Sequence, residues 1–498
     1  MKTLCLLYFL IVLTIISSCT KLEREDFQNI PVNQFFKTEP DAKAAITNYY
    51  STAIMGLNGN SYGGNGVMGE SQTDMMEYAY DGNVGYFTNH FFLTATQYST
   101  NLGNVIGSYS TIVRHISRGT NLIPKLETIP MDETIRKRYI AEVRALRAHV
   151  ALWGYYMYGG VELFLDPNVL ADVNTPQYKP RATQKEMADF IVSEIDAIKD
   201  DLVGRYSKSE KDYGRMTRGA ALTIKLKLLM QEKRFAEAAT TAREILTLGY
   251  ALVPAYMNIF TLANEGNLET IWSVPCLTNL SPANTTHGET LQYDLPTTSP
   301  NIAKWGTWSI RWGFYDSFDP LDERRKGLIG QYTNTSGTLV TRGEGGLAKG
   351  AILLKYAIEP EMTGNSSGVD WIIFRYADVL LLLAEAINET NNGPTQEALD
   401  LVNQIRARAF PAMPAKLLQL TDYAGNKTKF NDAILKERGW ELYMEWHRRQ
   451  DLVRHGKFIE QALTVIPRGP VGDHIVLWPI PPTIVDQSKG IVTQNPGY

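Results

Sequence analysis

The chain has 498 residues, of which 44% are apolar, so it can bury a large core as two or three ordinary domains or as one solenoid-like domain with insertions. Its formal net charge of −4 comes with mixed signs and no basic stripe, so nucleic acid is not an expected partner. Its three cysteines form no Cys-x-x-Cys pattern and its seven histidines are scattered, so no disulfide framework, Cys/His metal site or cofactor is predicted.

The N-terminus has the pattern of a lipoprotein leader. Residues 1–18 start with Met1-Lys2, continue as an apolar run and end in small residues directly before Cys19. This pattern resembles the lipobox of bacterial lipoproteins, in which the cysteine is lipidated and becomes the first mature residue. Acyl chains such as palmitate contribute about 0.8 kcal/mol per buried methylene, so a multiply acylated Cys19 would anchor stably. The alternative is an ordinary cleaved signal with an incidental cysteine.

The segment after the predicted lipid anchor is polar. Residues 19–40 would form a lipidated tether, and its acid-rich start resembles the surface-export signal of Bacteroidetes lipoproteins. The rest of the sequence has no apolar run of membrane-spanning length. A first helix is expected over 41–55, followed by a loop insertion over 56–107 that is rich in Gly, Asn, Ser and aromatic residues. Its glycines lack the Gly-Lys-Ser/Thr ending of a phosphate loop, so that reading is rejected.

Helical patterns then alternate with an irregular region. Apolar periodicity predicts helices over 104–126 and 133–158, and a capping box at Thr183 predicts the start of the next. From residue 250 to 370 the periodicity is poor, with short strand-like pieces at 270–274 and 352–356. This stretch reads as an insertion between helical pairs.

The stretch from Arg375 to Ala409 predicts a helical hairpin. One apolar stripe ends at Asn391-Asn392-Gly393-Pro394, and a second begins after Thr395, a predicted N-cap. The stripe over 398–405 has a counterpart 160 positions earlier, in the hairpin of residues 220–249. Each unit has roughly the 34 residues of a tetratricopeptide helix pair, and stacked pairs form scaffolds that bind partners. The alternative is two unrelated hairpins that agree by chance.

The C-terminal third predicts a long helix from Asn431 to about His455. Glu441 and Glu445 share one face of it, and ion pairs with Arg448-Arg449 are a better interpretation than a metal site with His447. The group Arg449, Asp451 and Arg454 is interpreted as structural salt bridges. A structural calcium at Asp316, Asp319 and Asp322 stays open, although the spacing misses the calcium-loop pattern.

Several segments in a fixed order carry a resemblance to a known family. They are Arg375–Ala386 (Arg-Tyr-Ala-Asp-Val-Leu-Leu-Leu-Leu-Ala-Glu-Ala), Glu437–Leu442 (Glu-Arg-Gly-Trp-Glu-Leu), Arg449–Lys457, the Phe318–Arg325 stretch, Trp478-Pro479-Ile480-Pro481 and the ending Asn495-Pro496-Gly497-Tyr498. Together with the lipobox they resemble the SusD/RagB family of Bacteroidetes outer-membrane lipoproteins, over essentially the whole mature chain. The family implies a mainly α fold of four tetratricopeptide-like helical pairs with an irregular region that carries the ligand site.

The resemblance also implies partners, a location and a division of the chain. It implies a TonB-dependent transporter of the SusC type, a glycan or in some members a peptide as ligand, and an outer-membrane location facing the cell exterior. The expected division is a helical region over 41–249, an irregular ligand-binding insertion over 250–370 and a C-terminal helical region over 371–498.

Two aromatic loop clusters, at 78–92 and 305–315, are the candidate ligand site. Aromatic faces suit the C–H faces of sugars, while amides and charged groups suit the hydroxyls. The expected platforms are Tyr86, Trp305 and Trp308, and the expected hydrogen-bonding residues are Asp81, Asn83, Asn89 and Arg311. The alternative for each aromatic residue is that it pins a loop to the scaffold.

The function expected from these patterns is capture of a glycan at the cell surface and its delivery to the transporter. The alternative is the same scaffold binding peptides or acting only as a transporter lid. Catalysis is not expected. The close acidic pairs Asp74 with Glu77 and Asp316 with Asp319 could be proposed for glycoside hydrolysis, but such pairs occur in any chain of this length.

Overall fold

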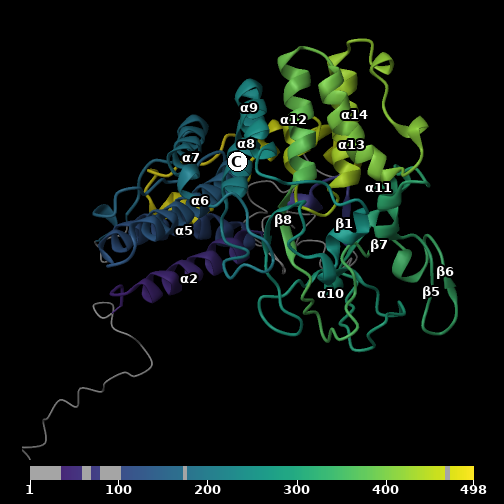
Figure 1. The fold of residues 1–498 in the computed structure, drawn as a ribbon, viewed down its shortest axis with the longest axis horizontal. Helices are drawn as coiled ribbons and strands as arrows, with labels where there is room; N and C mark the ends of the chain where they lie inside the picture. The colour runs from purple at the N-terminus through teal and green to yellow at the C-terminus, as the bar shows by residue number, and fades with distance from the viewer. Residues whose placement is uncertain (1–34, 59–68, 79–102, 172–176, 466–471) are drawn as a thin grey trace, which may run out of the picture.

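The computed structural model describes residues 35–58, 69–78, 103–171, 177–465 and 472–498. Helices at one side of the molecule continue through α8 (Arg218–Gln231) and α9 (Phe235–Leu246) to a second group, from α12 (Tyr376–Thr390) to α14 (Lys427–Glu441). The irregular region lies beside that second group (Figure 1). The predicted leader 1–18, Cys19 and the tether up to residue 34 lie outside the described residues. Among the described helices, none combines the length and apolarity that crossing a membrane requires.

The N-terminal helices confirm the periodicity-based expectations closely. They are α2 (Glu39–Asn58), α5 (Gly103–Thr128), α6 (Glu133–Tyr158) and α7 (Gln184–Ile198). Helix α5 packs on α2 and α6, and α6 packs on α7. The capping box is present, because the Thr183 side chain accepts from the Glu186 backbone N–H while the Glu186 carboxylate accepts from the Thr183 backbone N–H.

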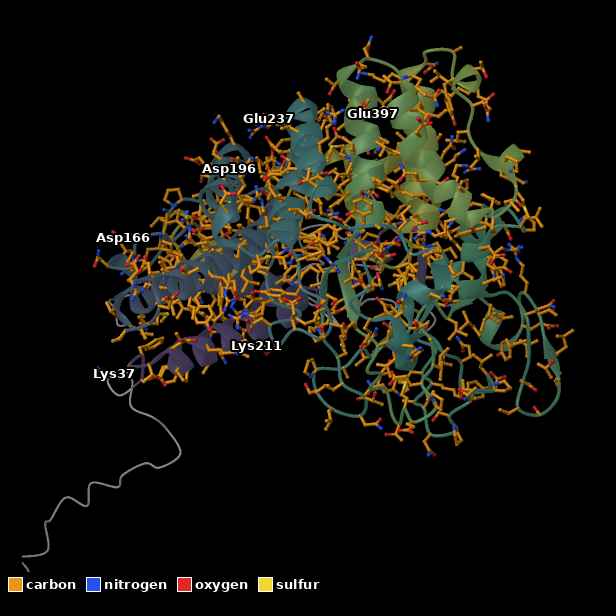
Figure 2. The ribbon with its side chains drawn as sticks, in the orientation of Figure 1. Lys37, Asp166, Asp196, Lys211, Glu237 and Glu397 are labelled. Atoms are coloured by element: carbon orange, nitrogen blue, oxygen red, sulfur yellow. The ribbon has the colours of Figure 1, made fainter. Side chains whose placement is uncertain are left out.

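Two later hairpins form the predicted repeat. They consist of α8 (Arg218–Gln231) with α9 (Phe235–Leu246), and of α12 (Tyr376–Thr390) with α13 (Gln396–Ala409). Thr395 is the N-cap of α13, as predicted. Helix α9 packs against α12, so the hairpins are neighbours although more than 120 residues separate them in sequence. The first-turn residues Glu237 and Glu397 lie at the same outer edge of the molecule (Figure 2). The mainly α, tetratricopeptide-like fold is therefore confirmed.

The irregular region leaves and re-enters the scaffold through one pair of strands. Strand β2 (Thr270–Val274) pairs antiparallel with β8 (Trp371–Arg375), which leads directly into α12. Between them, β3 (Trp308–Arg311), β7 (Gly350–Leu353) and β4 (Leu328–Ile329) join a four-stranded sheet with β1 (Met76–Tyr78) in the order β1-β3-β7-β4. The smaller elements of this region are β5 (Tyr332–Thr333), β6 (Leu339–Val340), α10 (Thr286–Thr290), α11 (Trp312–Asp316) and the 3-10 turns Tyr256–Phe260, Leu262–Asn264, Glu323–Gly327 and Gly345–Leu347.

The predicted long helix over 431–455 is wrong. The structure has α14 (Lys427–Glu441), a turn, and then α15 (Arg448–Arg454) and α16 (Phe458–Val465). Met444 and Trp446 in the turn have positive φ values of 56° and 66°, which break the helix although neither residue is glycine. The remaining elements are α17 (Pro482–Gln487) and the 3-10 turns Val169–Ala171, Lys199–Asp201, Pro414–Lys416, Leu420–Asp422 and Asp473–Val476.

The turn after α14 contributes Glu445 to a buried ionic cluster that joins the irregular region to the scaffold. We call this cluster the ionic joint: Glu269, Asp322, Arg324, Lys355, Arg375, Arg408, Glu437, Glu441 and Glu445. Arg375 contacts Glu269 at 2.8 Å, Glu441 at 2.5 Å and Glu445 at 2.7 Å. The expected ion pairing of Glu441 and Glu445 is thus confirmed, but the partners are not Arg448 and Arg449.

Candidate functional site

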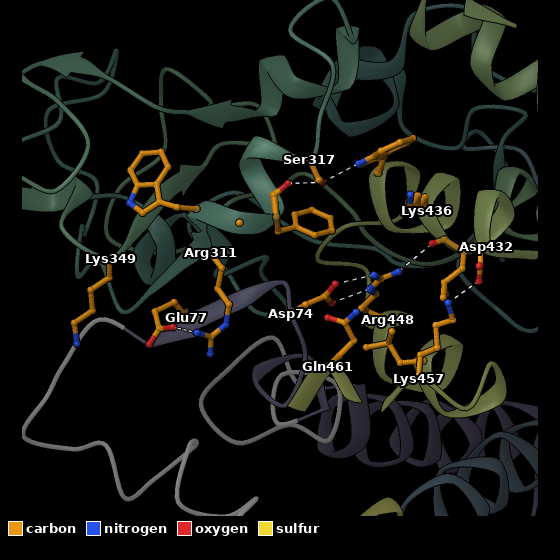
Figure 3. A pocket seen from close by; sticks show the side chains of 16 residues that line it. Asp74, Glu77, Arg311, Ser317, Lys349, Asp432, Lys436, Arg448, Lys457 and Gln461 are labelled. Atoms are coloured by element: carbon orange, nitrogen blue, oxygen red, sulfur yellow. Dashed lines mark hydrogen bonds and ion pairs between the residues drawn. The ribbon is translucent and has the colours of Figure 1, made fainter. Parts of the chain in front are cut away.

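An open cleft of about 1040 Å³ lies where the irregular region meets the C-terminal helices (Figure 3). Ligand pockets in proteins typically measure about 300–1,000 Å³, so the cleft has room for several sugar rings or a short peptide. One wall comes from β1, β3 and α11, and the other comes from α14, α15 and α16. The cleft is lined by Asp74, Glu77, Arg311, Trp312, Gly313, Phe314, Ser317, Lys349, Asp432, Leu435, Lys436, Trp440, Arg448, Leu452, Lys457 and Gln461.

Strand pairing brings the two irregular segments of the sequence together at the cleft. Strand β1 pairs antiparallel with β3, with Glu77 opposite Ser309, and the Arg311 backbone N–H donates to the Met75 carbonyl at 2.9 Å. The Arg311 guanidinium forms an ion pair with the Glu77 carboxylate across the two strands. Burial lowers the pKa of Arg311, while Glu77 and Asp74 oppose that shift. This pair therefore fixes one end of the cleft wall.

The segment before β1 is tied to the helical wall by Arg448. Its guanidinium binds both carboxylate oxygens of Asp74, at 2.9 and 2.8 Å, in the bidentate geometry that favours Arg–carboxylate pairs. Its backbone N–H donates to Oε1 of Glu70 at 3.0 Å. Burial raises the pKa of Glu70 to about 8, so this carboxyl is mostly protonated at neutral pH. The two walls are thus joined by contacts between residues more than 370 positions apart.

Two half-buried indoles line the cleft. The Trp440 Nε1–H donates to Ser317 Oγ at 3.0 Å, which connects α14 to the segment after α11 and fixes the orientation of the ring. Trp312 begins α11, contacts the Tyr315 ring edge-on and has the Arg342 guanidinium 4.7 Å from its ring centre. Indole rings that are fixed in orientation and have charged groups beside them are suited to contact sugar rings.

The sequence-predicted site residues fall into three groups. Arg311 lines the cleft, as a site residue would. Trp305 is 45% exposed but lies beside Gly288 of α10 and outside the cleft lining. Asp81, Asn83, Tyr86 and Asn89 lie outside the described residues. Glu77 lines the cleft, and the described chain stops one residue later, at Tyr78. The four residues therefore follow the cleft-lining Glu77 closely in sequence.

Trp308 requires a correction. It is only 3% exposed, and its ring packs edge-on against Trp446 at 6.4 Å between ring centres, so its faces are not open to a ligand in this structure. Ile310, two positions on, is also fully buried. In a strand, alternate residues share a face, so the spacing of Trp308 and Ile310 places both toward the core.

Trp312 and Trp440 are the cleft residues that sequence reasoning did not select. Trp312 belongs to the 305–315 cluster but is not among the expected platforms. Trp440 follows a glycine inside a helix and carries no local signal for a site. Lys349, Lys436 and Lys457 were also missed, because single lysines in polar sequence look like ordinary surface residues.

The carboxylates considered for catalysis or calcium have cationic partners of their own. Asp74 and Glu77 both line the cleft, but each is held by a guanidinium, an arrangement that fits a structural role better than an acid–base pair. Asp316 pairs with Arg342 at 2.8 Å, Asp319 with Lys416 at 2.5 Å and Asp322 with Arg324 at 2.7 Å. The three aspartates therefore point to three different cations and do not share one centre.

The fold and the cleft define a class: a helical-hairpin scaffold with an open cleft beside its irregular region. Comparison with known sequences narrows the class. A sequence model of the SusD family matches residues 254–465. SusD-like protein P25 of Formosa agariphila is 24% identical over 489 residues, covering 89% of this chain and 88% of P25. SusD-like protein P38 of the same organism is 26% identical over 508 residues, covering 95% and 94%. These matches support the assignment of the chain to the SusD/RagB family.

Solved structures share the fold over nearly the whole chain. A SusD-like protein from Bacteroides fragilis superposes with a TM-score of 0.77 at 22% identity, covering 94% of this chain and 99% of that one. Surface glycan-binding protein A from Bacteroides thetaiotaomicron, in complex with laminarihexaose, gives a TM-score of 0.72 at 20% identity and 93% and 100% coverage. A laminarin-binding SusD-like protein gives a TM-score of 0.74 at 24% identity and 93% and 100% coverage.

Proposed function

We propose that this chain is a surface glycan-binding lipoprotein, anchored through Cys19, that captures an oligosaccharide or polysaccharide and passes it to a TonB-dependent transporter of the SusC type. The observation that carries the proposal is the cleft with its two half-buried indoles, Trp312 and Trp440, and a rim of charged groups. Its place in the fold supports the proposal, because two proteins of the same fold bind laminarin or a laminarin oligosaccharide. The protein would act by binding alone, without catalysis.

In this proposal Trp312 and Trp440 stack on sugar rings, and Arg311 bonds to hydroxyl groups. Trp305 would extend the surface as an outer platform, since nearly half of its side chain is exposed. Tyr86, Asp81, Asn83 and Asn89 remain proposed contacts at the same edge, as their closeness to Glu77 along the chain suggests. In the proposed domain division the ligand-binding insertion is residues 250–370. One wall of the site comes instead from the C-terminal helical region, residues 371–498.

The test is retention of the full chain, purified in detergent, on glycan gels and arrays. Trp312→Ala and Trp440→Ala are each expected to weaken glycan binding about two- to tenfold, the range of one aromatic contact. Tyr293→Ala is the matched control, because Tyr293 is 78% exposed and lies outside the cleft lining. Trp305→Ala tests the outer platform.

Thermal melting of each variant separates lost binding from lost folding. Retention that survives both indole substitutions would move the site away from the cleft. Absence of retention on every glycan, with binding of peptides instead, would favour the peptide-binding alternative, and binding of neither would favour a protein that acts only as a lid. Copurification of the transporter with the chain from membranes tests the proposed partner.

A further inference from the structure

Arg342 covers one side of the cleft indole of Trp312. Its guanidinium carbon lies 4.7 Å from the centre of the Trp312 ring, within the distance of about 6 Å at which a cation is attracted to an aromatic ring. Arg342 itself is not among the described residues that line the cleft. The side of the indole that meets Arg342 is therefore occupied, and a ligand in the cleft has to approach the ring from elsewhere.

The same guanidinium also binds the carboxylate of Asp316, with 2.8 Å between Nη1 and Oδ2. Trp312 and Asp316 are the first and last residues of α11. Residues four positions apart lie on the same face of a helix, so one arginine side chain can meet both of them. The carboxylate of Asp316 thus holds the guanidinium of Arg342 against the indole, and the arginine spans this short helix.

The loop that carries Arg342 joins β6 to β7 and is held in shape by its own contacts. The Thr341 backbone N–H and hydroxyl both donate to Oε2 of Glu344, at 3.0 and 2.9 Å. The Gly343 backbone N–H donates to the Leu347 carbonyl at 3.1 Å, and the Leu347 side chain is fully buried. Arg342 therefore extends from a loop of defined shape, so its guanidinium is directed at α11 without help from a ligand.

A second contact restricts the indole from another direction. The rings of Trp312 and Tyr315 meet edge-on, with 5.4 Å between their centres. Tyr315 is fixed in turn, because the Arg325 guanidinium lies 4.4 Å from its ring centre and a Cβ at Gly330 would collide with its hydroxyl. The Trp312 ring is thus held between neighbours of its own region before any ligand enters the cleft.

We propose that Arg342 is a positioning residue of the glycan site: held by Asp316, it fixes the Trp312 ring and confines sugar stacking to the side of the indole away from the guanidinium. The inference rests on the proposed glycan-binding function and adds a residue outside the cleft that sets the geometry of one platform. A ring that is already fixed loses less freedom when a ligand binds, so the affinity is higher. Because Arg342 acts through the indole, its contribution should vanish when the indole is absent.

The test is a double-mutant cycle on glycan affinity, measured by isothermal titration of the full chain in detergent. The probes are oligosaccharides of glucan, mannan, xylan and galactan, and the one that the parent chain binds most tightly is used for every variant. Arg342→Met should weaken its binding about two- to fivefold, the size of one exposed cation–aromatic contact. In a Trp312→Ala background the same substitution should have no effect, since residues that act through one contact are not additive.

Two further variants and a control sharpen the cycle. Arg342→Lys keeps the charge but not the planar guanidinium, so it should restore only part of the affinity. Asp316→Asn should weaken binding in the same direction, because it releases the guanidinium. Arg243→Met is the matched control: its pair with Glu397 is also 2.8 Å long, and the two side chains are 50% and 54% exposed, against 55% and 49% for Arg342 and Asp316.

Fluorine NMR of the chain labelled with 5-fluorotryptophan reports on the ring itself. The Trp312 signal is the one that disappears in Trp312→Phe. Arg342→Met should shift this signal, whereas Arg243→Met should leave it in place. Both arginine variants should melt close to the parent chain, because exposed ion pairs contribute little to stability.

The outcomes separate this inference from the proposed function. Parental affinity in Arg342→Met would overturn the positioning role and leave glycan binding standing. Equal weakening with and without the indole, or weakening with an unshifted Trp312 signal, would overturn it too, because Arg342 would then act by another route. Parental affinity in Trp312→Ala, or binding of none of the oligosaccharides, would overturn the inference together with the proposed function on which it rests.

Discussion

The helical scaffold and the ionic joint hold the molecule together by different interactions. In α13, Ala398, Val402 and Ile405 are fully buried and pack as an apolar stripe, and the same pattern recurs in α9. At the ionic joint, by contrast, fully buried guanidinium groups such as that of Arg375 face several carboxylates at once. Apolar stripes tolerate change of similar volume, whereas a buried charge depends on particular partners. The irregular region is therefore attached by buried ion pairs, which tolerate substitution less well than the apolar packing of the helices does.

The electrostatics of the ionic joint show this dependence. Burial alone would raise the pKa of Glu441, but Arg408, Arg375 and Arg324 hold it well below its ordinary value. Burial lowers the pKa of Lys355 to about 8, although Glu445 opposes that shift. Each ion is thus tolerated in the interior only because its partners are there.

Removing the central cation should give the largest loss of stability. Arg375→Met removes a buried cation that contacts Glu269, Glu441 and Glu445 at once, so the free energy of unfolding should fall by about 3–5 kcal/mol. The measurement is urea unfolding followed by circular dichroism. Arg243→Met is the matched control, because its pair with Glu397 is 50% and 54% exposed, and it should change stability by less than about 1 kcal/mol. Similar losses of stability in both variants would contradict the greater importance of the buried ion pairs over the exposed pair.

Truncating the apolar stripe should cost somewhat less. Ile405→Ala in α13 and Ile245→Ala in α9 each remove a fully buried side chain, and each should lower the free energy of unfolding by about 2–5 kcal/mol. Because the two residues are equivalent in the repeated hairpins, the losses should be similar. Gln404→Ala, an exposed change on the same helix, should stay within about 0.5 kcal/mol. Clearly unequal losses at Ile245 and Ile405 would argue against equivalent packing.

Acid should weaken the charged contacts before the apolar ones. The pKa values of Glu441 and Glu445, and of Glu385 beside Arg454, lie below their ordinary values in the folded chain. The stabilisation is therefore complete above the unfolded-state pKa of about 4.3 and is lost as pH falls below it. By pH 3.5 the loss is about 1 kcal/mol each for Glu441 and Glu385, and Glu445 adds to it in the same direction. Melting temperatures measured between pH 7 and pH 3.5 check this, and a flat profile would contradict it.

The smallest expected effect is at a helix end. Thr183→Ala removes the side-chain acceptor of the α7 capping box and should lower the free energy of unfolding by about 1 kcal/mol. Thr183→Ser retains the hydroxyl and should be close to the parent protein. Equal stability of all three forms would show that the hydrogen bonds of this cap contribute little.

The same contrast explains which parts of the fold could be predicted from sequence. The residues of α6 and the capping box of α7 were predictable because periodicity and caps are local signals. The break after α14 was not, because Met444 and Trp446 adopt left-handed backbone conformations without a glycine to signal them. The turn places Glu445 against Lys355 and Arg375, and such long-range pairing leaves no local trace.

The site was less predictable than the scaffold. The sequence located the irregular segments and Arg311, since aromatic and polar residues gather there. It could not show that Trp308 turns inward while Trp312 reaches the cleft, because that depends on how β3 lies between β1 and β7. The sequence also could not reveal the ion pair between Asp74 and Arg448, because the two residues are far apart along the chain.

The β2–β8 pairing has a consequence for how such proteins diversify. The two strands lie side by side, so the stretch between them departs from the helices and returns at adjacent points. Lengthening a loop whose ends are already close together costs little entropy, because the closure term grows only slowly with length. Substitutions, insertions or wholesale exchange within residues 275–370 can therefore reshape one wall of the cleft while the helical frame keeps its form. Ligand preference can change in this way without a new fold.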